Sequence, residues 1–167
     1  YLLYLRGWNG LAIDASYKSK KLFQKYRPRD KFSCNVVGLE DGIEVSFFTP
    51  SEKDGLALGS TKFPDKNKIY SETRHFQVNI TNELRRQGID KIHFLNVDIE
   101  DAEMELLNTL DFTRHSPSVI AIEIHGNDIE KNLKSEIALF LKDKGYICVA
   151  SAVITYFFVK KSEVNTR

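Results

Sequence analysis

The feature that most limits the fold of this 167-residue chain is a pair of continuous apolar runs. Residues 118–126 read SVIAIEIHG, and residues 91–97 read KIHFLNV. Runs that are mostly apolar or β-branched over this length are typical of strands covered on both faces of a parallel sheet. A helical pattern from about residue 102 to residue 110 separates them. The chain is therefore predicted to contain a strand–helix–strand unit.

Strands and helices alternate along the rest of the chain. In order, the pattern predicts a buried helix at residues 2–8, a strand at 11–13, a helix at 17–27 ended by Pro28, a strand at 31–39, a hairpin to a strand at 43–49, a helix that begins at Thr81 or Asn82, a helix from Asp128 to 144, and an antiparallel pair at 146–161 divided near Ser151. This order predicts a doubly wound α/β sheet, mostly parallel with an antiparallel C-terminal hairpin, in a single domain over residues 1–167. Residues 50–75 show no sustained hydrophobic periodicity of a helix or a strand and are predicted to form a long loop or lid.

Composition excludes several classes of protein. The chain is 42% hydrophobic and 28% charged with a net charge of +1, which is ordinary for a globular protein and gives no global attraction to nucleic acid. No run approaches the ~18 apolar residues of a membrane helix, and no segment resembles a secretory signal, so we expect a cytoplasmic protein. Cys34 and Cys148 lie far apart in strand-like runs and are interpreted as reduced core residues.

Polar residues at the predicted strand ends are the candidates for function, because ligands of open parallel sheets bind outside the carboxyl ends of the strands. Asp14 ends an early strand, where an acid can accept hydrogen bonds from both hydroxyls of a nucleoside ribose. The alternative is a turn or helix-capping role, which the sequence DAS also suits. Gly38 ends the next strand.

Four acids, Asp98, Glu100, Asp101 and Glu103, follow the strand at residues 91–97. Carboxylates in the first turn of a helix each gain ~0.3–1 kcal/mol from the helix dipole, which explains one or two of them. Asp98 is explained less well, because a carboxylate at the end of a buried strand is desolvated unless it faces a cleft or finds donors. The functional alternatives are a general base, a contact to a cationic cofactor, or a metal ligand.

His125 and Glu123 lie two apart on one face of the strand at residues 118–126. Histidine suits proton transfer near neutral pH, although a histidine at a strand end is often structural.

Residues 18–31 carry seven basic residues and one acid, Asp30. They suit phosphate binding or, as the simpler alternative, the solvated face of a surface helix.

Several segments together resemble the FkbM family of S-adenosylmethionine-dependent methyltransferases. They are, in order, RGWNGLAIDAS, NVVGLEDGIEVSFF, NITNEL and IDKIHFLNVDIEDAEMELLNTLDFTRHSPSVIAIEIHG, which together span residues 6–126. The resemblance implies a Rossmann-like class I methyltransferase fold whose last strand is inserted antiparallel. It also implies S-adenosylmethionine as cofactor and a hydroxyl of a sugar, glycan or secondary metabolite as methyl acceptor.

The resemblance assigns roles to particular residues. Asp14 and Ala15 match the end of the strand that holds the cofactor ribose, and Gly38, Leu39 and Glu40 match the loop near the adenine. Asp98 and Glu100 match the first two acids of the family's D-V-E-G-x-E motif, which faces the reacting centre, and Glu103 matches its last acid. His125 is the most plausible base. No complete set of metal ligands is evident.

Two departures from the family are visible. Asp101 stands where the family has glycine. The family's first strand and glycine-rich loop would precede Tyr1, so we expect this chain to be an N-terminally truncated fragment of the domain. The alternative function is a non-catalytic α/β binding or structural module that lacks the cofactor loop.

Overall fold

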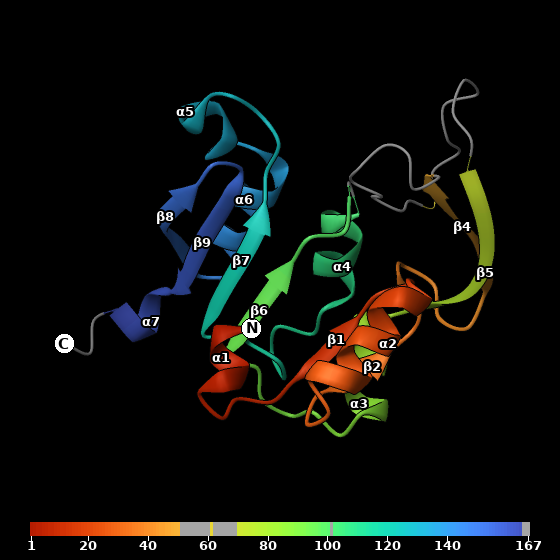
Figure 1. Cartoon of the computed structure of the whole chain (residues 1–167). Helices are drawn as coiled ribbons and strands as arrows, with labels where there is room; N and C mark the ends of the chain where they lie inside the picture. Colours follow the sequence, from red (N-terminus) through yellow and green to blue (C-terminus); the bar gives the residue numbers. More distant parts are fainter. Residues whose placement is uncertain (51–60, 62–69, 101, 165–167) are drawn as a thin grey trace. The chain divides into compact units, whose positions relative to one another are not determined.

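The computed structural model describes residues 1–50, 61, 70–100 and 102–164 (Figure 1). The chain divides into two compact units, Tyr1–Gln87 and Gly88–Arg167. Both combine helices with strands, and the sheets contain parallel as well as antiparallel pairs. The predicted α/β class is therefore confirmed.

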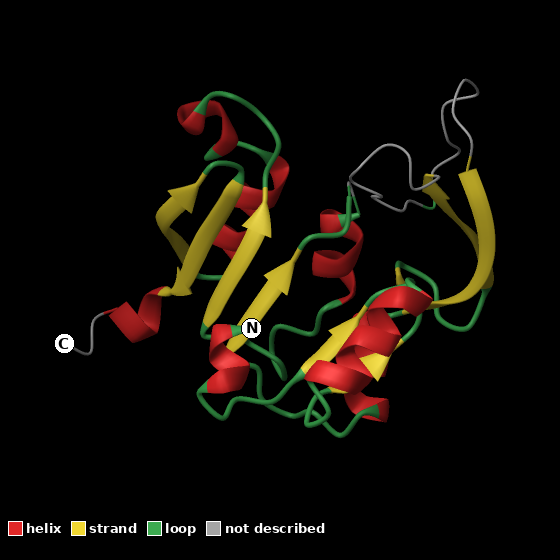
Figure 2. Cartoon of the chain, viewed as in Figure 1, coloured by secondary structure: helices red, strands yellow, loops and turns green. Residues whose placement is uncertain are grey.

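In the first unit, strand β1 (Leu11–Ile13) pairs in parallel with β2 (Lys31–Ser33). Helix α2 (Tyr17–Tyr26) connects the two strands and lies against them (Figure 2). The Phe23 and Phe32 rings of α2 and β2 have centroids 5.1 Å apart. The helix ends before Pro28, as the sequence predicts, because proline disfavours helical backbone in the preceding residue.

The predicted strand at residues 31–39 is two strands in different sheets. The second, β3 (Val36–Val37), pairs in parallel with β5 (Tyr70–Val78), and β5 pairs antiparallel with β4 (Glu44–Pro50). The predicted hairpin between residues 31–39 and 43–49 is therefore wrong, since β5 lies between β3 and β4. The physical reason is length: β3 offers two residues for pairing, whereas β5 offers nine.

The predicted loop at residues 50–75 is shorter at its end, because β5 begins at Tyr70. Residues 51–60 and 62–69, which hold most of the predicted lid, lie outside the described residues.

Two helices of the first unit differ from their predictions. Helix α3 (Ile80–Arg86) begins earlier, with Asn79 as its N-cap in place of Thr81 or Asn82, and this start buries Ile80. Helix α1 (Leu2–Leu5) is exposed rather than buried, with Leu2 at 76% exposure. A helix of one turn presents only one side to the rest of the chain, and there Tyr4 packs beneath the guanidinium of Arg29 at 4.0 Å.

The second unit contains a four-stranded sheet in the order β6-β7-β9-β8. Its strands are β6 (Phe94–Val97), β7 (Val119–Glu123), β8 (Tyr146–Ala152) and β9 (Thr155–Lys160), and α4 (Glu103–Thr109) connects β6 to β7. β6 and β7 are parallel, and β9 is antiparallel to both of its neighbours. The predicted C-terminal antiparallel pair is confirmed, with its break at residues 153–154 rather than at Ser151.

The core of this unit lies around β7. Ile120, Ala121 and Ile122 are consecutive and are each at most 1% exposed, so both faces of the strand are covered, as its composition predicts. Helix α6 (Glu136–Asp143) covers one face of the sheet (Figure 1) and buries Leu141 completely.

The helix predicted from Asp128 to residue 144 is interrupted. Asp128 caps a short helix, α5 (Ile129–Asn132), and Ser135 caps α6. The interruption follows Asn132, whose buried side chain hydrogen-bonds to backbone carbonyls after β7. A last short helix, α7 (Lys161–Val164), follows β9.

Both cysteines are free thiols, but they are half-buried rather than core residues. None of the helices in the described ranges combines the length and apolar character needed to cross a membrane.

Candidate active site

The predicted catalytic residues gather at the carboxyl ends of β6 and β7. Asp98 directly follows Val97, whose register partner in β7 is Ile122, and Glu123 directly follows Ile122. Side chains at matching positions of neighbouring strands lie on the same face of a sheet, so Asp98 and Glu123 are neighbours. Asp98 is exposed and Glu123 is half-buried.

Glu100, Glu103 and His125 lie near the same point. Burial raises the pKa of Glu123 above its ordinary range, and the negative charges of Asp98, Glu100 and Glu103 raise it further, whereas His125 lowers it. Asp98, Glu100, Glu103 and Glu123 are called the acidic cluster below. The structure therefore brings together all three predicted catalytic residues, Asp98, Glu100 and His125, within one unit.

The turn between β6 and α4 has an unusual backbone at Glu100, whose φ is +50°. Residues other than glycine seldom adopt this left-handed conformation, and it is common at functional sites.

Glu103, the first residue of α4, is only 5% exposed, and its Oε1 atom is buried without a hydrogen-bond partner. The dipole of a short helix does not compensate a buried carboxylate, so this side chain is an unusual feature of the cluster.

Sequence reasoning did not select Glu103 and Glu123 as site residues. Glu103 occupies the last acid of the family motif, but the helix dipole offered a simpler explanation for it. Glu123 is the last residue of β7 and stands two residues before His125, and this spacing was the sequence feature that could have indicated it. Its central place among the acids depends on the pairing of β6 with β7.

The loop that carries His125 is fixed by Asn132. The Asn132 Nδ2 atom donates to the carbonyls of Ile124 and Gly126 at 3.3 Å each, and to the Tyr156 hydroxyl at 3.0 Å. Gly126 has φ +144°, and a Cβ atom there would lie 2.3 Å from Asn132 Oδ1. The backbone on both sides of His125 is therefore held in place, while its imidazole is exposed.

In the first unit, Asp14 directly follows β1 and has an exposed side chain. Its Oδ1 atom accepts a hydrogen bond of 2.8 Å from the backbone N–H of Ser16, the N-cap of α2. The turn role that the sequence left open is thus present. It occupies one carboxylate oxygen and leaves the other available to a ligand.

Ala15 is buried beside this turn, and its carbonyl accepts a weak hydrogen bond from Cys34 Sγ at 3.5 Å. Burial raises the pKa of the Cys34 thiol, Lys20 lowers it and Asp14 raises it, which places all three groups close together. Ala15 therefore contributes backbone and packing rather than a polar side chain.

The segment Gly38–Glu40 follows β3 and packs against Gln77 of β5. A Cβ atom on Gly38 would lie 2.2 Å from the end of the Gln77 side chain, so a larger residue here would require Gln77 to move. With its amide oxygen turned toward the segment, Gln77 accepts hydrogen bonds of 2.9 Å from the backbone N–H groups of Leu39 and Glu40. Because these donors are engaged, the exposed Leu39 side chain is the part that could contact an adenine.

An ion pair that sequence reasoning missed anchors the same segment to α3. Asp41 accepts hydrogen bonds from Arg86 Nη1 at 2.8 Å and Nη2 at 3.0 Å, and from the Asn79 N–H at 2.9 Å. The hydrogen bond from Arg86 is the main reason that the pKa of Asp41 falls to about 2.

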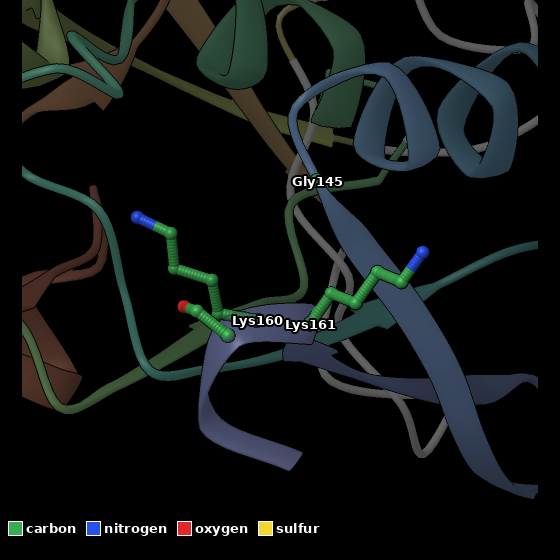
Figure 3. Close-up of a pocket in the computed structure, with 4 residues that line it drawn as sticks. Gly145, Lys160 and Lys161 are labelled. Carbon is green, nitrogen blue, oxygen red and sulfur yellow. The ribbon is translucent and has the colours of Figure 1, made fainter. Parts of the chain in front are cut away.

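One hollow in the second unit does not qualify as a site. It has a volume of about 400 Å³ and is lined by Gly145, Lys160, Lys161 and Ser162. The two lysine side chains point away from each other (Figure 3), so they do not converge on a ligand. Within the described part of the chain, no group of three or more His, Cys, Asp or Glu residues is arranged to hold a metal ion.

The fold and the cluster define an α/β protein with acids and a histidine at the carboxyl ends of two parallel strands. The chain matches the model of the methyltransferase FkbM domain over residues 5–148, a range that contains all the predicted site residues. It therefore belongs to the FkbM methyltransferase family. No curated protein and no solved structure matches it.

Proposed function

We propose that this chain is an S-adenosylmethionine-dependent methyltransferase with a Rossmann-like class I fold. Its acceptor would be a hydroxyl of a sugar, a glycan or a secondary metabolite. The observation that carries the proposal is the grouping of Asp98, Glu100 and His125 at one sheet edge in a chain of this family.

The first unit would bind the cofactor, which supplies an electrophilic methyl group when bound. Asp14, with one free carboxylate oxygen, is suited to accept hydrogen bonds from ribose hydroxyls beside the buried Ala15. Gly38, Leu39 and Glu40 would lie near the adenine, with the exposed Leu39 side chain packing against the base.

The second unit would bind the methyl acceptor. Methyl transfer to a hydroxyl requires that its oxygen be oriented for in-line attack and that its proton be removed. His125 would take this proton, since it is exposed and its loop is fixed by Asn132. Asp98 and Glu100 would orient the acceptor hydroxyl.

Calorimetric titration of the full-length protein with S-adenosylmethionine tests the proposed cofactor binding. Wild type should bind, and Asp14→Ala should bind at least about tenfold more weakly, because charge-assisted hydrogen bonds are worth roughly 1.5–3 kcal/mol. Glu44→Ala, which removes an exposed acid of β4, is the control and should bind like wild type.

Absence of binding by wild type would favour the non-catalytic α/β module instead. Equal affinity of wild type and Asp14→Ala would contradict the role of Asp14.

A further inference from the structure

We propose that the outward face of α2 binds the surface of a lipid bilayer that contains anionic lipids. This face, called the basic face below, carries Lys18, Lys21 and Lys25 together with Leu22 and Tyr26. The inference goes beyond the proposed function and does not depend on it, because the basic face contains none of the residues proposed to bind the cofactor or the acceptor.

The first argument is the geometry of the helix. Figure 2 shows α2 lying against β1 and β2, and Phe23 is on the inner side of the helix, where it contacts a ring of β2. Lys18, Lys21 and Lys25 follow one another at intervals of three and four residues, which places them on one face of a helix. All three side chains are exposed. The lysines therefore form a stripe along the side of α2 that points away from the strands.

The second argument is charge. The sequence of α2, YKSKKLFQKY, contains four lysines and no acid. Asp30, the one acid of residues 18–31, already accepts a hydrogen bond from Arg27. Among the residues that the structure describes, no acid forms an ion pair with Lys21 or Lys25. The positive charge of the basic face is therefore available to complement an anionic surface.

The third argument distinguishes a membrane from a nucleic acid. Leu22 is 48% exposed and Tyr26 is 52% exposed, and their spacing of four residues makes them neighbours on the helix surface beside the lysines. The ammonium group of Lys25 lies 4.9 Å from the centre of the Tyr26 ring, so charge and apolar surface are adjacent. An aliphatic side chain finds no complementary group on a phosphate backbone, whereas the interfacial region of a bilayer accepts both leucine and tyrosine.

Vesicle flotation of the full-length protein tests the inference, with vesicles of phosphatidylcholine alone and with vesicles that also contain about one-third phosphatidylglycerol. Each basic residue near an anionic surface strengthens binding roughly fivefold, so three lysines should give a preference of about a hundredfold for the anionic vesicles. The preference should largely disappear at about 1 M salt, where the Debye length is roughly 3 Å.

Two charge-reversal variants separate the basic face from net charge. Lys21→Glu combined with Lys25→Glu should remove the preference for anionic vesicles. Lys134→Glu combined with Lys142→Glu changes the net charge equally at two exposed positions of the second unit, and this control should keep the preference. Leu22→Ser should weaken binding to the anionic vesicles several-fold, because it removes the apolar contact and leaves the charges in place.

Equal binding of wild type to the two kinds of vesicle would overturn the inference, as would an equal loss of the preference in the control variant. Leu22→Ser with the affinity of wild type would also overturn it, because nothing would then distinguish a membrane from another polyanion. Binding of wild type to a single-stranded oligodeoxynucleotide but to neither vesicle would assign the basic face to a nucleic acid instead.

Discussion

Glu103 is a buried acid at the start of α4, and its Oε1 atom has no hydrogen-bond partner. A first-turn acid gains ~0.3–1 kcal/mol from the helix dipole. The effective penalty for a buried ion without a partner is several kcal/mol, which is the larger effect. The buried Glu103 carboxyl group is therefore expected to reduce the stability of the protein.

We predict that Glu103→Gln raises the free energy of unfolding by about 1 kcal/mol, because it keeps the shape of the side chain and removes its charge. Urea denaturation followed by circular dichroism measures the change. Glu105→Gln, on the exposed side of α4, should stay within about 0.5 kcal/mol of wild type. A loss of stability in Glu103→Gln would show that the carboxylate is compensated in solution.

The sequence also predicted the positions of some single residues at the ends of strands. Asp98 and His125 stand at strand ends that the apolar runs define, and they do lie at one sheet edge. Glu123 was not selected, because its place among the acids depends on which strand lies beside β7.

Among the secondary-structure elements, the connection from β7 to α5 is the best example of structure imposed by one contact. Asn132 is the last residue of α5, and its side chain donates hydrogen bonds to the carbonyls of Ile124 and Gly126. The resulting close approach leaves no room for a Cβ atom at Gly126.

Gly126→Ala is predicted to destabilise the protein by about 2 kcal/mol, since it adds an overlap with Asn132 to the strain of a positive φ. Gly145→Ala is the matched control. Its φ is +85° but its Cβ would meet no atom within 4 Å, so the expected loss is about 1 kcal/mol. Urea denaturation of both variants provides the comparison. Equal losses of unfolding free energy in the two variants would show that the Asn132 side chain moves away from the added methyl group without loss of stability.

Pairing between elements was predicted less well than the elements themselves. Gly42 has the positive φ of +82° that a turn requires, as expected. The strand after this turn nevertheless pairs with β5, which begins within the loop predicted at residues 50–75. Hydrophobic patterns identify strands, but they do not identify the partner when a longer strand competes for the same edge.

For the whole molecule, pH acts in opposite directions on the two units through Asp41 and Glu123. The pKa of Asp41 is lowered in the folded state, mainly by the hydrogen bond from Arg86. The pKa of Glu123 is raised, first by burial and then by Asp98. A lowered carboxyl pKa stabilises the folded state at high pH, whereas a raised one stabilises it at low pH.

The Asp41 ion pair is predicted to contribute about 1 kcal/mol to stability at pH 7, the upper part of the range for exposed pairs. The contribution should be fully present above the ordinary pKa of 3.8 and should disappear as the pH falls toward the folded-state pKa of about 2. Thermal denaturation of wild type and Asp41→Asn from pH 7 to pH 2 measures it. A difference that persists unchanged at pH 2 would contradict the assignment.

Glu123→Gln should show the opposite dependence. The folded-state pKa of Glu123 is raised above 4.5, so its contribution is favourable below that pH and is lost as the pH rises through the folded-state pKa. The variant is therefore predicted to be more stable than wild type at pH 7 and to approach it at pH 4. The same denaturation series gives the result, and a variant less stable than wild type at pH 7 would refute the prediction.

The sequence by itself determined the α/β class, the strand pair around residues 91–97 and 118–126, the C-terminal antiparallel pair and the FkbM resemblance. These features follow from local composition and from motifs whose residues lie close together in the chain. Only the tertiary structure decided that β5 separates β3 from β4, that Asn132 interrupts the helix after Asp128, and that Glu103 and Glu123 complete the acidic cluster. The strand order and the cluster depend on contacts between distant parts of the sequence, and the Asn132 contacts depend on how the loop after β7 folds back on α5. In each case competition among partners rather than local preference sets the outcome.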